Sequence, residues 1–344
     1  MEIKRLSLEE WGEQLPPTGF EVFHTPEALS VLDAHSSGEL TLLGGFKGQS
    51  TVALLPVFVR SGPIGQVVTS PPPVMGVPRL GPLVMPNSPK RSKREKVTRR
   101  FVEGVMEHLD ATGSLSIVRI QCPLGFDDPR PFAWNQFDVE TSFTYVLDVE
   151  DDLETVLGSF NKSLRREFRH ANTTDLSVIQ GDVDMAKRIV SQVQTRYEEH
   201  DDLGKIEWPY ARDLLQELGD RSRIYVVRDP DGQFLSGIVA LYSNDTVYFW
   251  QGGVAQSYEQ RLEDGSTRTI SVNALLHRTI IEDVLTDPEL ADIDKYDLVG
   301  ANTQRLCEYK SKFGPRLEPY YVIESSGIGT MLAKSGFQFV SRVR

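Results

Sequence analysis

Arginine side chains gather in one short stretch of the chain, and arginine is well suited to binding phosphate. Arg165, Arg166 and Arg169 follow Lys162. Because positions four apart share a face of a helix, Arg165 and Arg169 point to the same side if this stretch is helical. Their planar guanidinium groups form paired hydrogen bonds with phosphate oxygens. We therefore expect both to bind the phosphates of a nucleotide-linked or tRNA substrate. The alternative is a solvated helix face, since Glu167 lies among them.

A second basic segment, residues 90–100, carries seven lysines and arginines and is the densest in the chain. The chain as a whole is acidic, with a formal net charge of −12. Binding of nucleic acid through the whole surface is therefore excluded, because such binding depends on neutralising phosphates. A local contact between residues 90–100 and a nucleic acid or nucleotide stays open, as does a solvated helix start.

Several classes of protein are excluded by what the sequence lacks. It contains no Gly-x-Ser-x-Gly, HExxH, Walker or GxGxxG motif, which argues against hydrolases, metalloproteases, kinases and dehydrogenases. Cys122 and Cys307 lie far apart, without neighbours at ligand spacing, so we expect no metal site, disulfide scaffold or permanently bound cofactor. The first residues lack the apolar run of a secretion signal, and no apolar run approaches the length of a membrane span. We expect a cytoplasmic protein; the oligomeric state is not encoded in any pattern.

Hydrophobic periodicity predicts the elements that position these side chains. The length of 344 residues favours two domains. The predicted strands are residues 39–46, 51–60, 115–120, 143–149, 223–228, 234–242, 246–251, 296–300 and 320–324. The predicted helices cover about 20 residues around 97–109, then 153–171, 182–199, a segment from 209, 271–285 and 303–313. A polar loop is expected just before residue 271.

This order of elements, together with several short segments, resembles the FemABX-like or BioF2-like branch of the GNAT acyltransferase superfamily. The segments are 164–171, the strand pair around Asp231-Gly232, V-N-A-L-L at 272–276, Y-D-L-V-G at 296–300 and Y-K-S-K-F-G at 309–314. The resemblance implies an α+β fold of two tandem GNAT-like domains, each a mixed, mostly antiparallel sheet flanked by helices. It places residues 1–147 plus 320–344 in the first domain and 148–319 in the second, catalytic one.

The resemblance also assigns roles to individual residues. Forming an amide from an ester or thioester requires a cation or hydrogen-bond donor where the oxyanion develops, and Lys310 occupies the lysine position of the family motif. The other residues implied to bind substrate are Tyr309, Asn273, Asp297, Trp250 and Tyr258. Structural explanations stand beside these roles: lysines often complement the dipole at a helix C-terminus, asparagine often caps helices, and aromatic residues often fill cores.

The function implied is transfer of an acyl or aminoacyl group onto an amine of a cell-surface glycan precursor or related metabolite. The donor is either aminoacyl-tRNA or acyl-CoA. Residues 261–268, R-L-E-D-G-S-T-R, place acids where the glycine-rich CoA cradle of acetyltransferases would hold pyrophosphate. Two alternatives stay open: an acyl-CoA-dependent N-acetyltransferase, and a non-catalytic GNAT-like module that binds RNA or a partner through residues 90–100.

Overall fold

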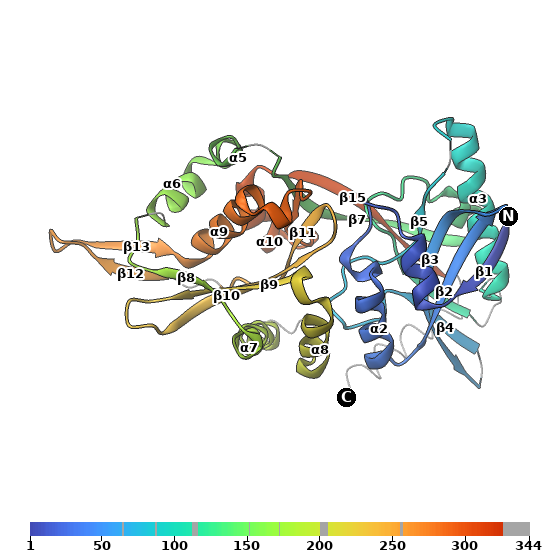
Figure 1. Ribbon diagram of the computed structural model, residues 1–344, viewed down its shortest axis with the longest axis horizontal. Coiled ribbons are helices and arrows are strands. Elements are labelled where there is room, and N and C mark those ends of the chain that lie inside the picture. Colours follow the sequence, from blue (N-terminus) through green and yellow to red (C-terminus); the bar gives the residue numbers. More distant parts are fainter. Residues whose placement is uncertain are drawn as a thin grey trace. The chain divides into compact units, whose positions relative to one another are not determined.

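The computed structural model divides into two compact units (Figure 1). It describes residues 1–63, 65–86, 88–111, 116–150, 152–171, 173–199, 206–254 and 257–325. The first unit contains Met1–Pro73, Val77–Ser142 and the described residues from Pro319 onward, and the second contains Val74–Gly76 and Phe143–Glu318. Of the segment 320–344 that the resemblance assigns to the first domain, residues 326–344 lie outside the described part.

The first unit is built on a sheet with the strand order β1-β2-β3-β4-β6-β15. Its neighbouring strands are antiparallel except for the parallel pair β4 and β6. The strands are β1 (Glu2–Leu6), β2 (Glu39–Lys47), β3 (Ser50–Gly62), β4 (Gly65–Ser70), β5 (Leu83–Val84, paired with β3), β6 (Ser116–Gln121) and β15 (Arg316–Ser325). The helices are α1 (Leu8–Gln14), α2 (Pro26–His35), α3 (Arg91–His108) and α4 (Arg130–Trp134).

Apolar side chains on α3 attach it to this sheet. Phe101, Val102 and Val105 are buried together with Ala53 and Leu55 of β3 in one core cluster. The spacing of four between positions 101 and 105 keeps one side of the helix against the sheet. The opposite side of α3, which carries the basic run, is left toward solvent.

The second unit repeats the same plan with the strand order β7-β14-β11-β10-β9-β8. Only β11 and β14 are parallel among its paired neighbours with a described register. The strands are β7 (Phe137–Asp148, from Phe143 in this unit), β8 (Ser177–Gln180), β9 (Ser222–Arg228), β10 (Phe234–Tyr242), β11 (Thr246–Gly252) and β14 (Lys295–Asp297), with a separate hairpin of β12 (Ser257–Arg261) and β13 (Thr267–Ser271). The helices are α5 (Leu153–Ser159), α6 (Lys162–Ala171), α7 (Val183–Glu199), α8 (Trp208–Leu218), α9 (Val272–Thr286) and α10 (Gln304–Lys310).

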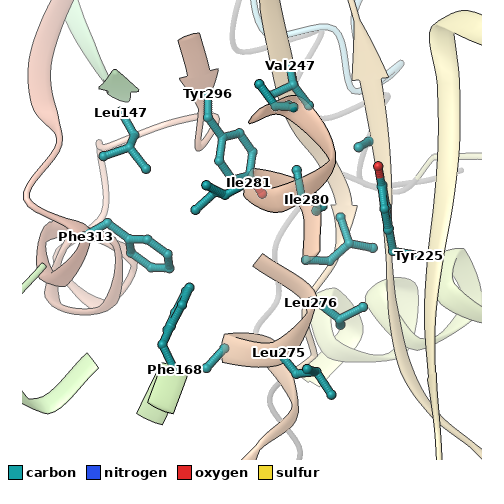
Figure 2. Close-up of a cluster of buried hydrophobic side chains, with 14 of the residues drawn as sticks. Leu147, Phe168, Tyr225, Val247, Leu275, Leu276, Ile280, Ile281, Tyr296 and Phe313 are labelled. Atoms are coloured by element: carbon teal, nitrogen blue, oxygen red, sulfur yellow. The ribbon is translucent and has the colours of Figure 1, made fainter. Parts of the chain in front are cut away.

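Helix α9 lies at the centre of the second unit's main core. Figure 1 shows α5, α6, α9 and α10 on one side of the sheet and α7 and α8 on the other. Figure 2 shows Leu275, Leu276, Ile280 and Ile281 of α9 pointing toward side chains from the sheet and from the flanking helices. Nine residues of this helix are buried, seven of them apolar and two of them, Asn273 and His277, polar. The predicted amphipathic helix thus turns its apolar side into the core. Because α9 is packed on several sides, the positions of its buried polar residues, Asn273 and His277, are fixed.

Both units share one order of elements: three antiparallel strands, a helix, then a strand parallel to the third. In the first unit the series is β2-β3-β4-α3-β6, and in the second it is β9-β10-β11-α9-β14. The predicted α+β class with two GNAT-like mixed sheets is thus confirmed. None of the helices in the described residues is both long and apolar enough to cross a bilayer.

Two local predictions need correction. The expected polar loop before α9 is instead the hairpin β12–β13. Half-exposed and exposed positions alternate along its strands, and only Ile270 is buried, so no apolar run marks them in the sequence. The predicted helix 153–171 is two helices. Phe160 adopts an extended backbone, and the Asn161 side chain accepts a hydrogen bond from Leu164 N at 2.8 Å, which starts α6 afresh.

Candidate active site

Lys310 is the most unusual charged residue of the second unit. It ends α10 and is only 6% exposed. Its Nζ donates hydrogen bonds to Val299 O at 2.6 Å and Gly300 O at 3.1 Å. An ammonium group has three N–H donors, and the third has no partner among the described residues. Nζ itself lies over the Phe249 ring, 6.0 Å from the ring centroid.

The carbonyl groups that hold Lys310 come from a strained turn after β14. Val299 has φ 53°, a left-handed conformation that branched side chains rarely adopt. The Asp297 carboxylate fixes this turn by accepting from Val299 N at 2.7 Å and from Thr144 Oγ1 at 2.6 Å. Thr144 Oγ1 in turn accepts from Gly300 N at 2.9 Å. Asp297 and Thr144, both fully buried, therefore aim two backbone carbonyls at the lysine.

The aromatic-Gly end of the 309–314 motif anchors Lys310 from the other side. Phe313 is fully buried and packs edge-on against Phe160, with ring centroids 5.1 Å apart. It also packs edge-on against Phe168, with ring centroids 6.1 Å apart (Figure 2). Gly314 has φ 63°, and a Cβ there would lie 2.3 Å from Ser159 O. Only glycine allows this close approach to α5. The motif spacing thus has a packing explanation: it locks the last turn of α10 onto the core.

Three further polar residues lie close to Lys310 and Phe249: Asn273 and His277 on α9, and Tyr309 on α10. The His277 and Phe249 ring centroids are 4.9 Å apart, and those of His277 and Tyr309 are 6.3 Å apart. Asn273 Nδ2 donates to Gly253 O at 2.9 Å, next to the Phe249 ring. Within the described residues, Asn273 Oδ1, His277 Nε2 and the Tyr309 hydroxyl are buried without a hydrogen-bond partner. Buried polar atoms of this kind are rare and need an explanation.

Burial alters the protonation of this cluster. It lowers the pKa of Lys310 from 10.5 to about 8, while the nearby Asp297 carboxylate acts in the opposite direction. Burial, together with the charge of Lys310, lowers the pKa of His277 to about 3. His277 is therefore neutral, and its Nδ1 pairs with the Tyr296 hydroxyl at 2.8 Å. Burial also raises the pKa of Tyr309, so that its hydroxyl keeps its proton.

Arg165 and Arg169 line a pocket of about 400 Å³. The remaining lining residues come from α5, α9 and the end of α6; they are Glu154, Leu157, Gly158, Thr173 and Arg278. The side chains of Arg165 and Arg169 have no ion-pair partner among the described residues, whereas Arg278 pairs with Glu282 at 2.6 Å. Among the described lining residues, the two unpaired guanidinium groups, set against the one acid Glu154, give the pocket an excess of positive charge. No described contact joins this pocket to Lys310.

Trp250 and Tyr258 do not join the cluster around Lys310. Trp250 is 5% exposed and donates from Nε1 to Gly76 O at 2.9 Å. Tyr258 lies on β12 and packs against the core of the second unit. Its pKa is raised by burial and by nearby acids, the first of which is Asp175. The structure thus brings Lys310, Tyr309, Asn273 and Asp297 together and leaves these two aromatic residues elsewhere.

The comparisons with known proteins bear on the fold that carries this cluster. Residues 158–311 match the model of the acetyltransferase (GNAT) domain. This segment is a GNAT domain. No curated protein matches the chain. Among solved structures, FemX is similar with a TM-score of 0.68 at 12% identity, over 93% of this chain and 97% of FemX. A conserved protein of unknown function from Bacteroides thetaiotaomicron VPI-5482 is similar with a TM-score of 0.51 at 10% identity, over 93% and 98%. At such identities the likeness establishes a shared fold, and it confirms the predicted FemABX-like architecture.

The GNAT domain offers a poor cradle for pyrophosphate at residues 261–268. The backbone N–H of Ser266 already donates to the Asp264 carboxylate at 2.9 Å, and the Ser266 hydroxyl donates to it at 2.6 Å. These hydrogen bonds lower the pKa of Asp264, so the turn keeps a negative charge. A phosphate there would meet a carboxylate instead of vacant amides. The residues present do not fit the usual binding mode of CoA.

The structure adds residues that sequence reasoning missed. His277 follows Asn273 by four positions, so the shared helix face was readable in the sequence. Phe249 and Thr144 carried no such signal, because each joins the site only through the pairing of β7, β14 and β11. Val299 lies in the Y-D-L-V-G segment, but nothing in that segment indicates that its carbonyl would hold Lys310. Thr144 also lies outside the matched segment 158–311.

Proposed function

We propose that the chain is an acyltransferase that moves an acyl or aminoacyl group from an ester or thioester donor onto an amine. The observation that carries this proposal is the buried ammonium of Lys310, held by two backbone carbonyls with its third N–H unpaired. Its place in a GNAT domain supports the same reaction class. In the reaction, a C–N bond forms, the C–O or C–S bond of the donor breaks, and a proton passes from the amine to the leaving group.

Lys310 would act as the cation that receives the developing oxyanion. Its position is set before substrate arrives, because the Val299–Gly300 carbonyls and the packing of Phe313 fix both ends of the side chain. A preorganised donor of this kind contributes about 10²- to 10³-fold to the rate of acyl transfer. Asp297, which lies behind the turn and bonds to protein groups, would serve as a positioning residue.

We propose an amine of a nucleotide-linked glycan precursor or a related metabolite as acceptor. The support is the pocket of Arg165, Arg169 and Arg278, whose size and charge suit a phosphate-linked group. For the donor, the carboxylate of Asp264 in the 261–268 turn argues against acyl-CoA bound in the usual way. Aminoacyl-tRNA is therefore the donor we favour over acyl-CoA.

A transfer assay with two donors and paired variants tests the proposal. Labelled aminoacyl-tRNA or acetyl-CoA is incubated with the chain and amine acceptors, with and without a nucleotide diphosphate. We expect product from aminoacyl-tRNA and a loss of at least about 100-fold in Lys310→Met. The matched control Lys312→Met, two positions along and half-exposed, is expected to retain activity. Loss of the Lys310 ammonium above its pKa of about 8 predicts falling activity in alkali.

Equal activity in Lys310→Met and Lys312→Met would reject the proposed role of the ammonium, and absence of transfer from either donor would reject the acyltransferase. Turnover with acetyl-CoA but not with aminoacyl-tRNA would reject only the favoured donor. Arg165→Gln with Arg169→Gln is expected to raise KM for the nucleotide-linked acceptor and leave KM for a phosphate-free amine unchanged.

A further inference from the structure

Two hollows flank the first turns of α3 in the first unit, and they differ sharply in charge balance (Figure 1 shows the helix). The larger, about 610 Å³, is lined by arginines that are already paired. Arg91 bonds Glu95 at 2.9 Å, and Arg94 approaches Asp127 at 3.3 Å. Arg130 binds Asp128 at 2.7 Å. This hollow is internally neutralised.

The smaller hollow, about 320 Å³, has no such balance. Its charged lining residues that the structure describes are all basic: Lys47, Lys93, Lys96 and Arg100. Each is exposed, and none forms an ion pair within the described residues. The rest of the lining is mostly apolar and consists of Met1, Val52, Pro86, Ser88 and Val97. We call this feature the basic hollow.

Only three of the basic residues in the run 90–100 line the basic hollow: Lys93, Lys96 and Arg100. Positions 93, 96 and 100 are spaced by three and four and so share one side of α3. They span about 10 Å along the helix axis at 1.5 Å per residue. Lys47 adds a fourth charge from the end of β2. In a chain with 49 acidic residues against 37 basic ones, four neighbouring cations without a counter-charge repel one another. An anionic ligand would remove this repulsion.

We propose that the basic hollow binds the phosphodiester backbone of RNA. Charges spread over about 10 Å suit successive phosphates of a strand better than a single phosphate group. Three of the four are lysines, which act as flexible point charges and suit contacts that do not read sequence. A recessed surface also suits a strand better than a flat lipid headgroup layer.

The proposal does not depend on the reaction proposed above, because it concerns binding by another unit. The test is fluorescence anisotropy with a labelled single-stranded RNA at several salt concentrations. The variant Lys93→Gln with Lys96→Gln is compared with the control Lys90→Gln with Arg99→Gln. Each removes two positive charges, so the net charge changes from −12 to −14 in both. The control positions lie on the same segment and line neither hollow.

We expect the basic-hollow variant to bind RNA about 10-fold more weakly and the control to bind like the parent chain. The slope of log affinity against log salt should fall by about 1.4 in the variant, since each phosphate contact contributes about 0.7 on single strands. Equal weakening in both variants, or no saturable binding by the parent chain, overturns the proposal. So does efficient competition by pyrophosphate, or lysine-dependent binding to anionic vesicles without RNA binding. Melting curves confirm that all variants are folded.

Discussion

Replacing Lys310 with methionine should give the chain a different dependence of stability on pH. Lys310 is 6% exposed, and its pKa falls from 10.5 in the unfolded chain to about 8 in the native protein. Below about pH 8 both states carry the proton, and the native state bears the full cost of the buried charge. Between about pH 8 and 10.5 the unfolded chain holds a proton that the native protein has lost. The free energy of unfolding therefore rises with pH across this window.

The size of the effect follows from the same values. A pKa lowered from 10.5 to about 8 corresponds to about 3 kcal/mol. Methionine has no proton to release, so its variant lacks this contribution. The variant also leaves the carbonyls of Val299 and Gly300 without their donor, which costs about 1 to 3 kcal/mol for each group. That loss is the same at every pH. It therefore shifts the difference in unfolding free energy between the parent chain and the variant by a constant, without changing how this difference depends on pH.

Urea unfolding at a series of pH values from about 7 to 10.5 measures the effect. The informative quantity is the unfolding free energy of the parent chain minus that of Lys310→Met, because other lysines and tyrosines cancel. It should be flat below about pH 8 and then rise by about 3 kcal/mol. Lys312→Met should show no rise. A difference curve without a pH-dependent segment would refute the buried, destabilised ammonium on which the proposed reaction rests.

Three smaller tests address other parts of the structure. Thr144→Val should lower the free energy of unfolding by about 2 to 4 kcal/mol in urea titrations, because it removes a donor from buried Asp297; a loss below 1 kcal/mol would contradict the network. Gly252→Ala should lower Tm markedly, since a Cβ would lie 2.2 Å from a backbone carbonyl at φ 123°; an unchanged Tm would be the contrary result. In native protein a thiol reagent should modify half-exposed Cys307 and spare Cys122, which is buried and whose pKa is raised; rapid reaction of both would contradict that burial.

Much of the fold was predictable because its signals are local. The meander β9–β11, the helix α9 and the strand β14 follow from apolar periodicities and turn residues that are visible in the sequence. The hairpin β12–β13 was missed because its strands are mostly polar, and a two-stranded ribbon needs no continuous apolar run. The break between α5 and α6 was missed because Phe160 continues the apolar stripe while its backbone leaves the helix.

The candidate site was predictable only in part, for a related reason. Lys310, Tyr309 and Asn273 were identified by a motif; the structure places Lys310 and Asn273 beside Phe249 and Tyr309 beside His277, which packs on Phe249. The contribution of Thr144 depends on β7 lying beside β14, which is a pairing between segments about 150 residues apart. Local sequence patterns carry no information on such a pairing. The same limit applies to the basic run, where only tertiary structure separates paired from unpaired cations.

The left-handed backbone of Val299 has a consequence for attempts to improve the protein. Holding a branched residue there costs about 1 to 3 kcal/mol, which glycine or asparagine would recover in part. Selection for heat resistance alone would favour such a replacement early. The more relaxed turn would hold the Lys310 ammonium less firmly. A replacement at position 299 is thus expected to raise thermostability and lower turnover. A screen that measures only the melting temperature would therefore select variants with reduced turnover.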